Sequence, residues 1–378
     1  MSDSRAAADS RHGIRSARRI VVKVGSSSLT HADGHLDEAR LAAIADAVAS
    51  ARLDGREVVL VTSGSIAAGI GPLGLPSRPR ELALQQAAAS VGQGKLIASY
   101  SAAFARHGLT VGQVLLTADD MVRRTHYGNA QRALHRLLEL GIVPIVNEND
   151  TVATDEIRFG DNDRLAALVA SVVHADALVL LTDVDALYTA SPHTPGARRI
   201  DVVRGPGDLA EVDVSRRGAA VGTGGMITKL EAASIATSSG APVVLAGSAD
   251  AAAALAGEDV GTVFLPTGKR SATRLTWLKH AAKTHGQLVL DAGAARAVAG
   301  RRASLLAAGV TAVRGEFEAG DAVELVGPDG VVVARGLAAF PAHEIPSMLG
   351  LSTADLKASL GEHFARPLVH IDDLIVVA

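Results

Sequence analysis

Short apolar runs alternate with longer amphipathic segments from Arg19 to about Pro266. The apolar runs are rich in β-branched residues and are typical of buried parallel strands. They are R-I-V-V-K-V-G from Arg19, E-V-V-L-V-T-S from Glu57, L-T-V-G-Q-V-L-L from Leu109, I-V-P-I-V-N from Ile142, A-L-V-L-L-T from Ala177 and P-V-V-L-A-G from Pro242. Helical patterns lie between them at 36–53, 81–107, 118–140 and 163–174. This order predicts an α/β fold, a parallel sheet with helices on both faces.

The pattern changes after Pro266. Residues 267–285 are basic and polar and predict a linker. Beyond them, short apolar runs punctuated by glycine and proline predict a small β-rich domain over 286–378. Residues 1–17 have no apolar core and predict a disordered leader. The α/β domain is therefore expected over 18–266.

Composition narrows the class of protein. Of the 378 residues, 48% are apolar, which is enough to bury two cores. A net charge of −3 gives no reason to expect a nucleic acid or an anionic membrane as the main partner. No apolar run approaches the roughly 20 residues that a membrane span needs. The chain has no cysteine, which excludes disulfides and thiolate chemistry and fits a cytoplasmic protein.

Polar clusters follow the predicted strands. The richest stretch, 142–170, contains N-E-N-D at 147–150 and D-N-D at 161–163 beside apolar segments. So much polarity next to a core predicts a ligand or metal site. Further clusters are Lys23 with G-S-S-S, Ser63 with G-S, and T-D-V-D from Thr182. Because ligands bind at the carboxyl ends of parallel strands, all these groups are expected at one edge of the sheet.

Two lysines and a glycine-rich segment suggest phosphate chemistry. The segment G-T-G-G-M-I-T-K, ending at Lys229, opens a helical pattern whose amides can approach phosphate oxygens, although an ordinary loop has the same composition. Lys23 interrupts a buried strand and is expected to face an anion or to pair with a neighbouring helix. The two lysines could flank a transferring phosphoryl group. Aspartates would hold the lysines in place or carry magnesium, and Asp163 is also expected to interact with the dipole of its helix. P-loop and dinucleotide-binding motifs are absent.

Six motifs, in this order, resemble the glutamate 5-kinases of the amino acid kinase superfamily. They are K-V-G-S-S at Lys23, V-T-S-G-S-I-A-A-G around Thr62, V-N-E-N-D around Asn147, F-G-D-N-D from Phe159, L-T-D-V-D-A-L-Y from Leu181 and G-T-G-G-M-I-T-K from Gly222. After the linker, G-Q-L-V-L-D-A-G-A-A-R-A-V and G-V-T-A-V-R-G-E-F-E-A-G-D-A-V-E-L resemble a PUA domain. The resemblance implies an amino acid kinase-type αβα sandwich with a mainly parallel sheet over 18–266, followed by a small β-rich PUA domain over 286–378.

The resemblance also implies a reaction, in which ATP with Mg²⁺ phosphorylates the γ-carboxylate of L-glutamate as the first step of proline biosynthesis. Lys23 and Lys229 would neutralise the moving phosphoryl group, and Asp163 would orient the lysines or magnesium. The implied glutamate-binding residues are Ser63, Asn147, Asp150 and Asn162. The implied ATP-binding residues are Lys23, Thr182, Asp183, Thr223, Gly224, Gly225, Met226, Ile227, Thr228 and Lys229. Ile227 departs from the family, in which a smaller residue is common here.

Family resemblance further implies inhibition by proline, a homodimer or homotetramer, and hand-over of the acyl phosphate to glutamyl-phosphate reductase. The carboxylate nucleophile is already ionised at pH 7, so the reaction needs no general base, and the sequence offers none.

Two alternatives stay open. Acetylglutamate, aspartate or UMP could replace glutamate as acceptor, because the superfamily shares its fold and ATP motifs. An RNA-binding protein is the rival from another class, since PUA domains are best known for that role. RNA binding is disfavoured because acidic side chains outnumber basic side chains from Gly286 onward. The bases are Arg296, Arg301, Arg302, Arg314, Arg335, Lys357 and Arg366; the acids are Asp291, Glu316, Glu318, Asp321, Glu324, Asp329, Glu344, Asp355, Glu362, Asp372 and Asp373.

Overall fold

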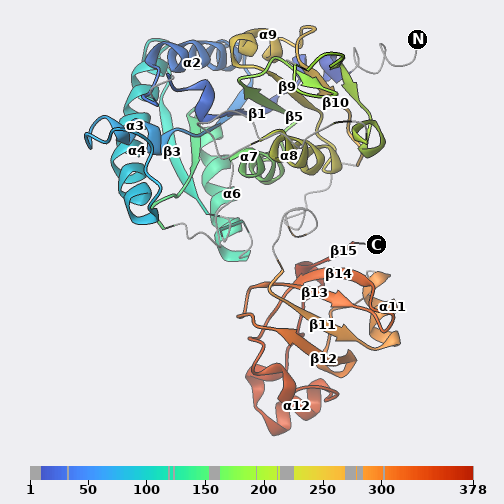
Figure 1. The fold of residues 1–378 in the computed structure, drawn as a ribbon. Coiled ribbons are helices and arrows are strands. Elements are labelled where there is room, and N and C mark those ends of the chain that lie inside the picture. Colours follow the sequence, from blue (N-terminus) through green and yellow to red (C-terminus); the bar gives the residue numbers. More distant parts are fainter. Residues whose placement is uncertain are drawn as a thin grey trace. The chain divides into compact units, whose positions relative to one another are not determined.

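The computed structural model divides into two compact units, residues 1–273 and 274–378 (Figure 1). The described residues are 10–31, 34–117, 120–121, 124–152, 162–192, 194–210, 212, 225–268, 278, 284–300 and 303–377. Most of the predicted linker, 267–285, lies outside the described residues. Each unit has its own apolar core.

An eight-stranded sheet forms the centre of the first unit, in the order β3-β4-β2-β1-β5-β9-β10-β8. The strands are β1 (Arg19–Val24), β2 (Glu57–Thr62), β3 (Val111–Leu116), β4 (Val143–Glu148), β5 (Ala177–Thr182), β8 (Val202–Val203), β9 (Val243–Gly247) and β10 (Thr262–Phe264). The six predicted strands are confirmed, and all of them run parallel. The short β10, which the pattern did not predict, is antiparallel to β9.

Helices cover both faces of this sheet. They are α2 (Glu38–Leu53), α3 (Ser65–Ile70), α4 (Leu82–Ala105), α6 (Arg124–Glu139), α7 (Asn162–Val172), α8 (Met226–Ser238) and α9 (Ala251–Leu255). Figure 1 shows α2 and α9 along one face and α7 and α8 along the other. Tyr100 and Phe104 of α4 are fully buried in the core with α2. The four predicted helices are confirmed, and the arrangement is the predicted mainly parallel α/β sandwich.

The segment before β1 differs from the predicted disordered leader. Residues 10–15 are helical, and Ile14 is completely buried. Arg11 pairs with Asp259 at 2.9 Å and donates to the Val260 carbonyl at 2.6 Å. These tertiary contacts hold the segment on the α/β unit, so the prediction is wrong for residues 10–17, while residues 1–9 lie outside the described residues.

The second unit is a small five-stranded sheet, in the order β12-β11-β13-β14-β15. Its strands are β11 (Gly286–Leu290), β12 (Val310–Gly315), β13 (Ala322–Val326), β14 (Val332–Leu337) and β15 (Leu374–Val376), with helices α11 (Ala292–Ala299) and α12 (Thr353–Ser359). Gly330 has a φ of +80°, which lets the P-D-G turn join β13 to β14. The unit is β-rich, as predicted. None of the helices in the described parts of the chain has the length and apolarity that a bilayer span requires.

Candidate active site

The order of the strands separates two sets of polar groups. Strand β1, which carries Lys23, lies between β2 and β5. On one side, Ser63 follows β2, and Asn147 lies near the end of β4. On the other side, Thr182 ends β5 and Asp183 follows it. The strands are parallel, so their carboxyl ends share one edge of the sheet, as the sequence predicted.

Lys23, Asp163 and Lys229 form a buried ionic cluster at this edge. Lys23 Nζ is 2.5 Å from Asp163 Oδ1, and Lys229 Nζ is 3.2 Å from Asp163 Oδ2. The side chains are 2%, 0% and 11% exposed for Lys23, Asp163 and Lys229. One carboxylate thus holds two ammonium groups, leaving one positive charge in excess among the three. Such a cluster is suited to an anionic ligand group.

The first turns of α7 and α8 position this ionic cluster. Asp163 lies in the first turn of α7, and Lys229 lies in the first turn of α8. The Thr228 hydroxyl lies 3.0 Å from Asp163 Oδ2 and 2.9 Å from the Gly225 carbonyl, so it holds the start of α8 against the carboxylate. Further along, Arg164 Nε donates to a carboxylate oxygen of Glu231 on α8 at 2.6 Å. The packing of α7 on α8 therefore fixes the lysine from β1 and the lysine from α8 on one anion.

Amide side chains form a second network over β2 and β4. Asn162 Nδ2 lies 2.9 Å from the Thr62 carbonyl, 2.8 Å from Ser63 Oγ and 2.9 Å from Asn147 Oδ1. Asn147 also donates through Nδ2 to Gln93 Oε1 of α4 at 2.7 Å. Asn162 Oδ1 is buried and has no hydrogen-bond partner among the described residues. The network can thus offer an acceptor to a charged donor such as an ammonium group.

The helices beside this network touch through their backbones. A Cβ added at Gly92 of α4 would lie 1.8 Å from the Ser65 carbonyl of α3, so only glycine permits this approach. Ser65 Oγ in turn donates to Asp150 Oδ2 at 2.8 Å. The Tyr100 hydroxyl lies 2.9 Å from Thr62 Oγ1, and burial raises the pKa of Tyr100 above its usual range, which keeps it neutral. The contacts fix the end of β2 against α3 and α4.

On the other side of β1, the end of β5 carries two of the predicted residues. Thr182 is buried and donates to Asp183 at 2.9 Å, while Asp183 is exposed. Among the described residues, no side chain caps α8 at Gly225, and the amides at such a helix start are suited to an anion. The predicted residues Thr223 and Gly224 lie outside the described residues. Ile227 is 49% exposed, so its bulk does not crowd the buried cluster.

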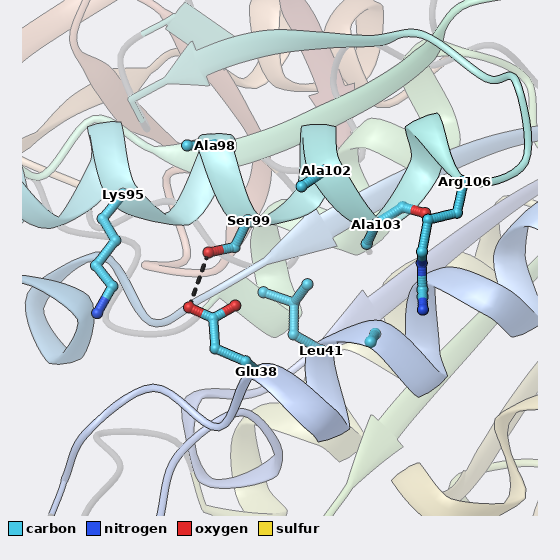
Figure 2. Close-up of a pocket in the computed structure, with 9 residues that line it drawn as sticks. Glu38, Leu41, Lys95, Ala98, Ser99, Ala102, Ala103 and Arg106 are labelled. Atoms are coloured by element: carbon cyan, nitrogen blue, oxygen red, sulfur yellow. Dashed lines mark hydrogen bonds between the residues drawn. The ribbon is translucent and has the colours of Figure 1, made fainter.

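No group of three His, Asp or Glu side chains suited to a metal occurs among the described residues. A hollow between α2 and α4 (Figure 2) lies elsewhere in the unit. Its lining includes Leu41 and Ala102, and Ser99 of its lining donates to Glu38 at 3.0 Å. Its lining includes no residue of the lysine cluster or the amide network.

The structure brings together six of the predicted site residues in two groups. The ionic cluster contains Lys23, Asp163 and Lys229, and the amide network contains Ser63, Asn147 and Asn162. Asp150 is joined to the network's surroundings through Ser65, which the sequence did not single out. Gln93 was also missed. It lies within a long helix rather than after a strand, so the strand-end rule gave no signal for it.

Comparison with known proteins agrees with this architecture. The sequence profile of the amino acid kinase family matches residues 18–247, and that of the PUA domain matches residues 286–360. A solved carbamate kinase from Giardia lamblia bound to AMP-PNP shares the fold, with a TM-score of 0.50 and 18% identity, over 66% of this chain and 99% of that chain. The class is thus defined as an amino acid kinase domain followed by a PUA domain.

Curated relatives resolve the family further. The chain is 60% identical over 369 residues to a glutamate 5-kinase of Streptomyces avermitilis, which covers 97% of this chain and 98% of the relative. It is 59% identical over 368 residues to a glutamate 5-kinase of Salinispora arenicola, which covers 97% of this chain and 100% of the relative. The chain belongs to the glutamate 5-kinase family.

Proposed function

We propose that this enzyme transfers the γ-phosphoryl group of ATP to the γ-carboxylate of L-glutamate, the first step of proline biosynthesis. The observation that carries the proposal is the position of the lysine cluster, with the amide network over β2 and β4 on one side and the end of β5 on the other. An acceptor on the amide side and a nucleotide on the β5 side would meet at the lysines. This is the arrangement that in-line transfer requires.

The amide network supports an α-amino acid as acceptor. Asn162 Oδ1 would accept from its ammonium group, with Ser63, Asn147 and Asp150 completing the glutamate site. On the β5 side, Thr182 and Asp183 would contact the nucleotide. The segment from Thr223 to Lys229, including Gly224, Gly225, Met226, Ile227 and Thr228, would line its phosphates.

The transfer follows from this placement. A γ-carboxylate oxygen of glutamate attacks the γ-phosphorus, and the new O–P bond forms as the bond to the β-phosphate oxygen breaks. The electron pair of that bond leaves with ADP. Lys23 and Lys229 neutralise charge that spreads over the equatorial oxygens, and Asp163 keeps both ammonium groups aimed at it. The nucleophile is ionised, so no side chain has to remove a proton.

Mg²⁺ fits the site as an ion carried by the nucleotide. Magnesium typically uses substrate phosphates, waters and one or two carboxylates, so the lack of a three-ligand cluster in the described part of the chain agrees with this mode. Asp163 is engaged by both lysines, which favours its role as their anchor over a role as metal ligand. When bound, the ion would offset the charge of the phosphates.

Other features of the family are part of the proposal. Proline would inhibit the enzyme, and the chain would form homodimers or homotetramers in the cytoplasm. The acyl phosphate product is labile, which favours hand-over to glutamyl-phosphate reductase. These features rest on family membership.

An acceptor panel tests the proposal. ADP release is measured with ATP, Mg²⁺ and either L-glutamate, N-acetylglutamate, L-aspartate or UMP, and hydroxylamine traps the acyl phosphate. Glutamate is expected to give much the highest kcat/KM. Turnover of N-acetylglutamate without turnover of glutamate would overturn the assignment.

A further inference from the structure

We infer that Gln93 is a positioning residue for the acceptor amino acid, acting through Asn147 on Asn162. The inference rests on the proposed function and adds a residue of α4 to it. Gln93 lies outside the strand ends that supply most of the site. Its link to the site is the hydrogen bond of 2.7 Å that its Oε1 accepts from Asn147.

The backbone fixes which way each amide in this chain of contacts points. The Thr62 carbonyl can only accept, so the Asn162 atom 2.9 Å from it is the nitrogen. The Glu148 N–H can only donate, so the Asn147 atom 2.9 Å from it is the oxygen. Asn147 therefore turns its nitrogen to Gln93, and Gln93 must present its oxygen. One backbone acceptor and one backbone donor thus set all three amides.

The orientation of these three amides determines what Gln93 does. With Gln93 as its acceptor, Asn147 keeps Oδ1 turned toward Asn162 Nδ2, at 2.9 Å. Asn162 is then held with Nδ2 toward Ser63 and with Oδ1 free for a substrate donor. Loss of the Gln93 acceptor would free the Asn147 amide to rotate and would loosen Asn162. The expected consequence is weaker binding of glutamate, with the lysine cluster unaffected.

Gln93 lies at a close contact between the backbones of α4 and α3. It follows Gly92, where the backbone of α4 presses on the Ser65 carbonyl of α3. Its second amide atom, Nε2, is buried without a hydrogen-bond partner among the described residues. A buried unpaired donor disfavours folding, so a glutamine here is better explained by its action on Asn147 than by stability. An apolar replacement removes this donor and is expected to fold.

The test is steady-state kinetics of Gln93→Met, with Gln85→Met as the matched control. Gln85 lies on the same helix, and its amide donates to the exposed Arg80 carbonyl. Gln93→Met should raise the KM for glutamate about five- to tenfold, the effect of one hydrogen bond, with kcat, the KM for ATP and the Tm little changed. Gln85→Met should match the wild type. The side chain of Gln93→Asn is one carbon too short to reach Asn147, so this variant should behave like Gln93→Met. It provides the test if the methionine variant misfolds.

A double-mutant cycle identifies the path. If Gln93 acts through Asn147, then Gln93→Met combined with Asn147→Ala should raise the KM for glutamate no further than Asn147→Ala alone. Three results would each overturn the inference. They are effects of the two substitutions on the glutamate KM that multiply, a glutamate KM unchanged in Gln93→Met, and a rise in the KM for ATP in Gln93→Met equal to that for glutamate. A wild type without glutamate-dependent ADP release would overturn the proposed function as well. An active wild type with unresponsive Gln93 variants would overturn this inference alone.

Discussion

Replacement of Asp163 by asparagine tests whether one carboxylate organises both lysines. The substitution keeps the shape of the side chain and removes its charge. Asp163 is completely buried, and its two oxygens lie 2.5 Å and 3.2 Å from the ammonium groups of Lys23 and Lys229. Without the carboxylate, two buried cations would face each other without their shared anion.

The magnitude follows from burial. Removing one partner of a buried ion pair typically costs about 3–5 kcal/mol, because the remaining charge stays desolvated. For a domain of this size, each kcal/mol corresponds to roughly 2–4 °C, so the Tm should fall by on the order of 10 °C. Since the lysines would no longer be aimed at the phosphoryl group, kcat should fall by about 10²- to 10³-fold.

Asp46→Asn is a matched control. Asp46 also bridges two basic groups, with Oδ1 2.8 Å from Arg106 and 2.7 Å from His107, but its side chain is 48% exposed. Exposed pairs of this kind contribute about 0–1 kcal/mol. The control should leave both kcat and Tm nearly unchanged.

The assay combines thermal unfolding with ADP release at saturating ATP and glutamate, below the Tm of each variant. Wild-type kcat in Asp163→Asn would refute the idea that Asp163 aims the lysines. A Tm drop in Asp46→Asn as large as that in Asp163→Asn would refute the argument from burial.

Three further predictions concern binding, packing and pH. Asn162→Ala should raise the KM for glutamate at least tenfold with little change in the KM for ATP, and an equal rise in both would contradict the assignment of sides. Gly92→Ala should lower the Tm measurably, because its Cβ would lie 1.8 Å from the Ser65 carbonyl; an unchanged Tm would rule out that tight contact. Burial, followed by the charge of Arg19, lowers the pKa of His135 below its ordinary 6.5, so the folded state binds this proton less readily than the unfolded state. The stability that neutral His135 contributes is present above pH 6.5 and is lost as the pH falls below that value. The Tm of His135→Gln should therefore decrease less between pH 6.5 and pH 5 than the Tm of the wild type. Equal decreases in Tm would count against the argument.

The sequence predicted the sheet because burial leaves a strong local pattern. A strand such as β1, covered on both faces, must be apolar along its length, and Lys23 stood out for that reason. The strand-end rule then located Ser63, Asn147 and Thr182 from chain position alone. The sequence left open whether Lys23 faces an anion or pairs with a neighbouring helix. Only the structure shows that it pairs with Asp163.

Other features depend on contacts that no local pattern records. The segment around Arg11 looked disordered because its order comes from carbonyls near residue 260, far away in the chain. Gln93 looked like one polar residue among many on α4, and its meaning comes from a hydrogen bond to Asn147, 54 positions away. Tertiary partners, rather than propensity, decide both cases.

The central claim is that the γ-carboxylate of glutamate attacks ATP. It is tested most directly with L-glutamate labelled with ¹⁸O in both γ-carboxylate oxygens, turned over with ATP, Mg²⁺ and hydroxylamine. Hydroxylamine attacks the acyl carbon and releases phosphate with the bridging oxygen, so mass spectrometry should find one ¹⁸O in each released phosphate, together with γ-glutamyl hydroxamate. Unlabelled phosphate and no hydroxamate would mean that water, not glutamate, accepts the phosphoryl group.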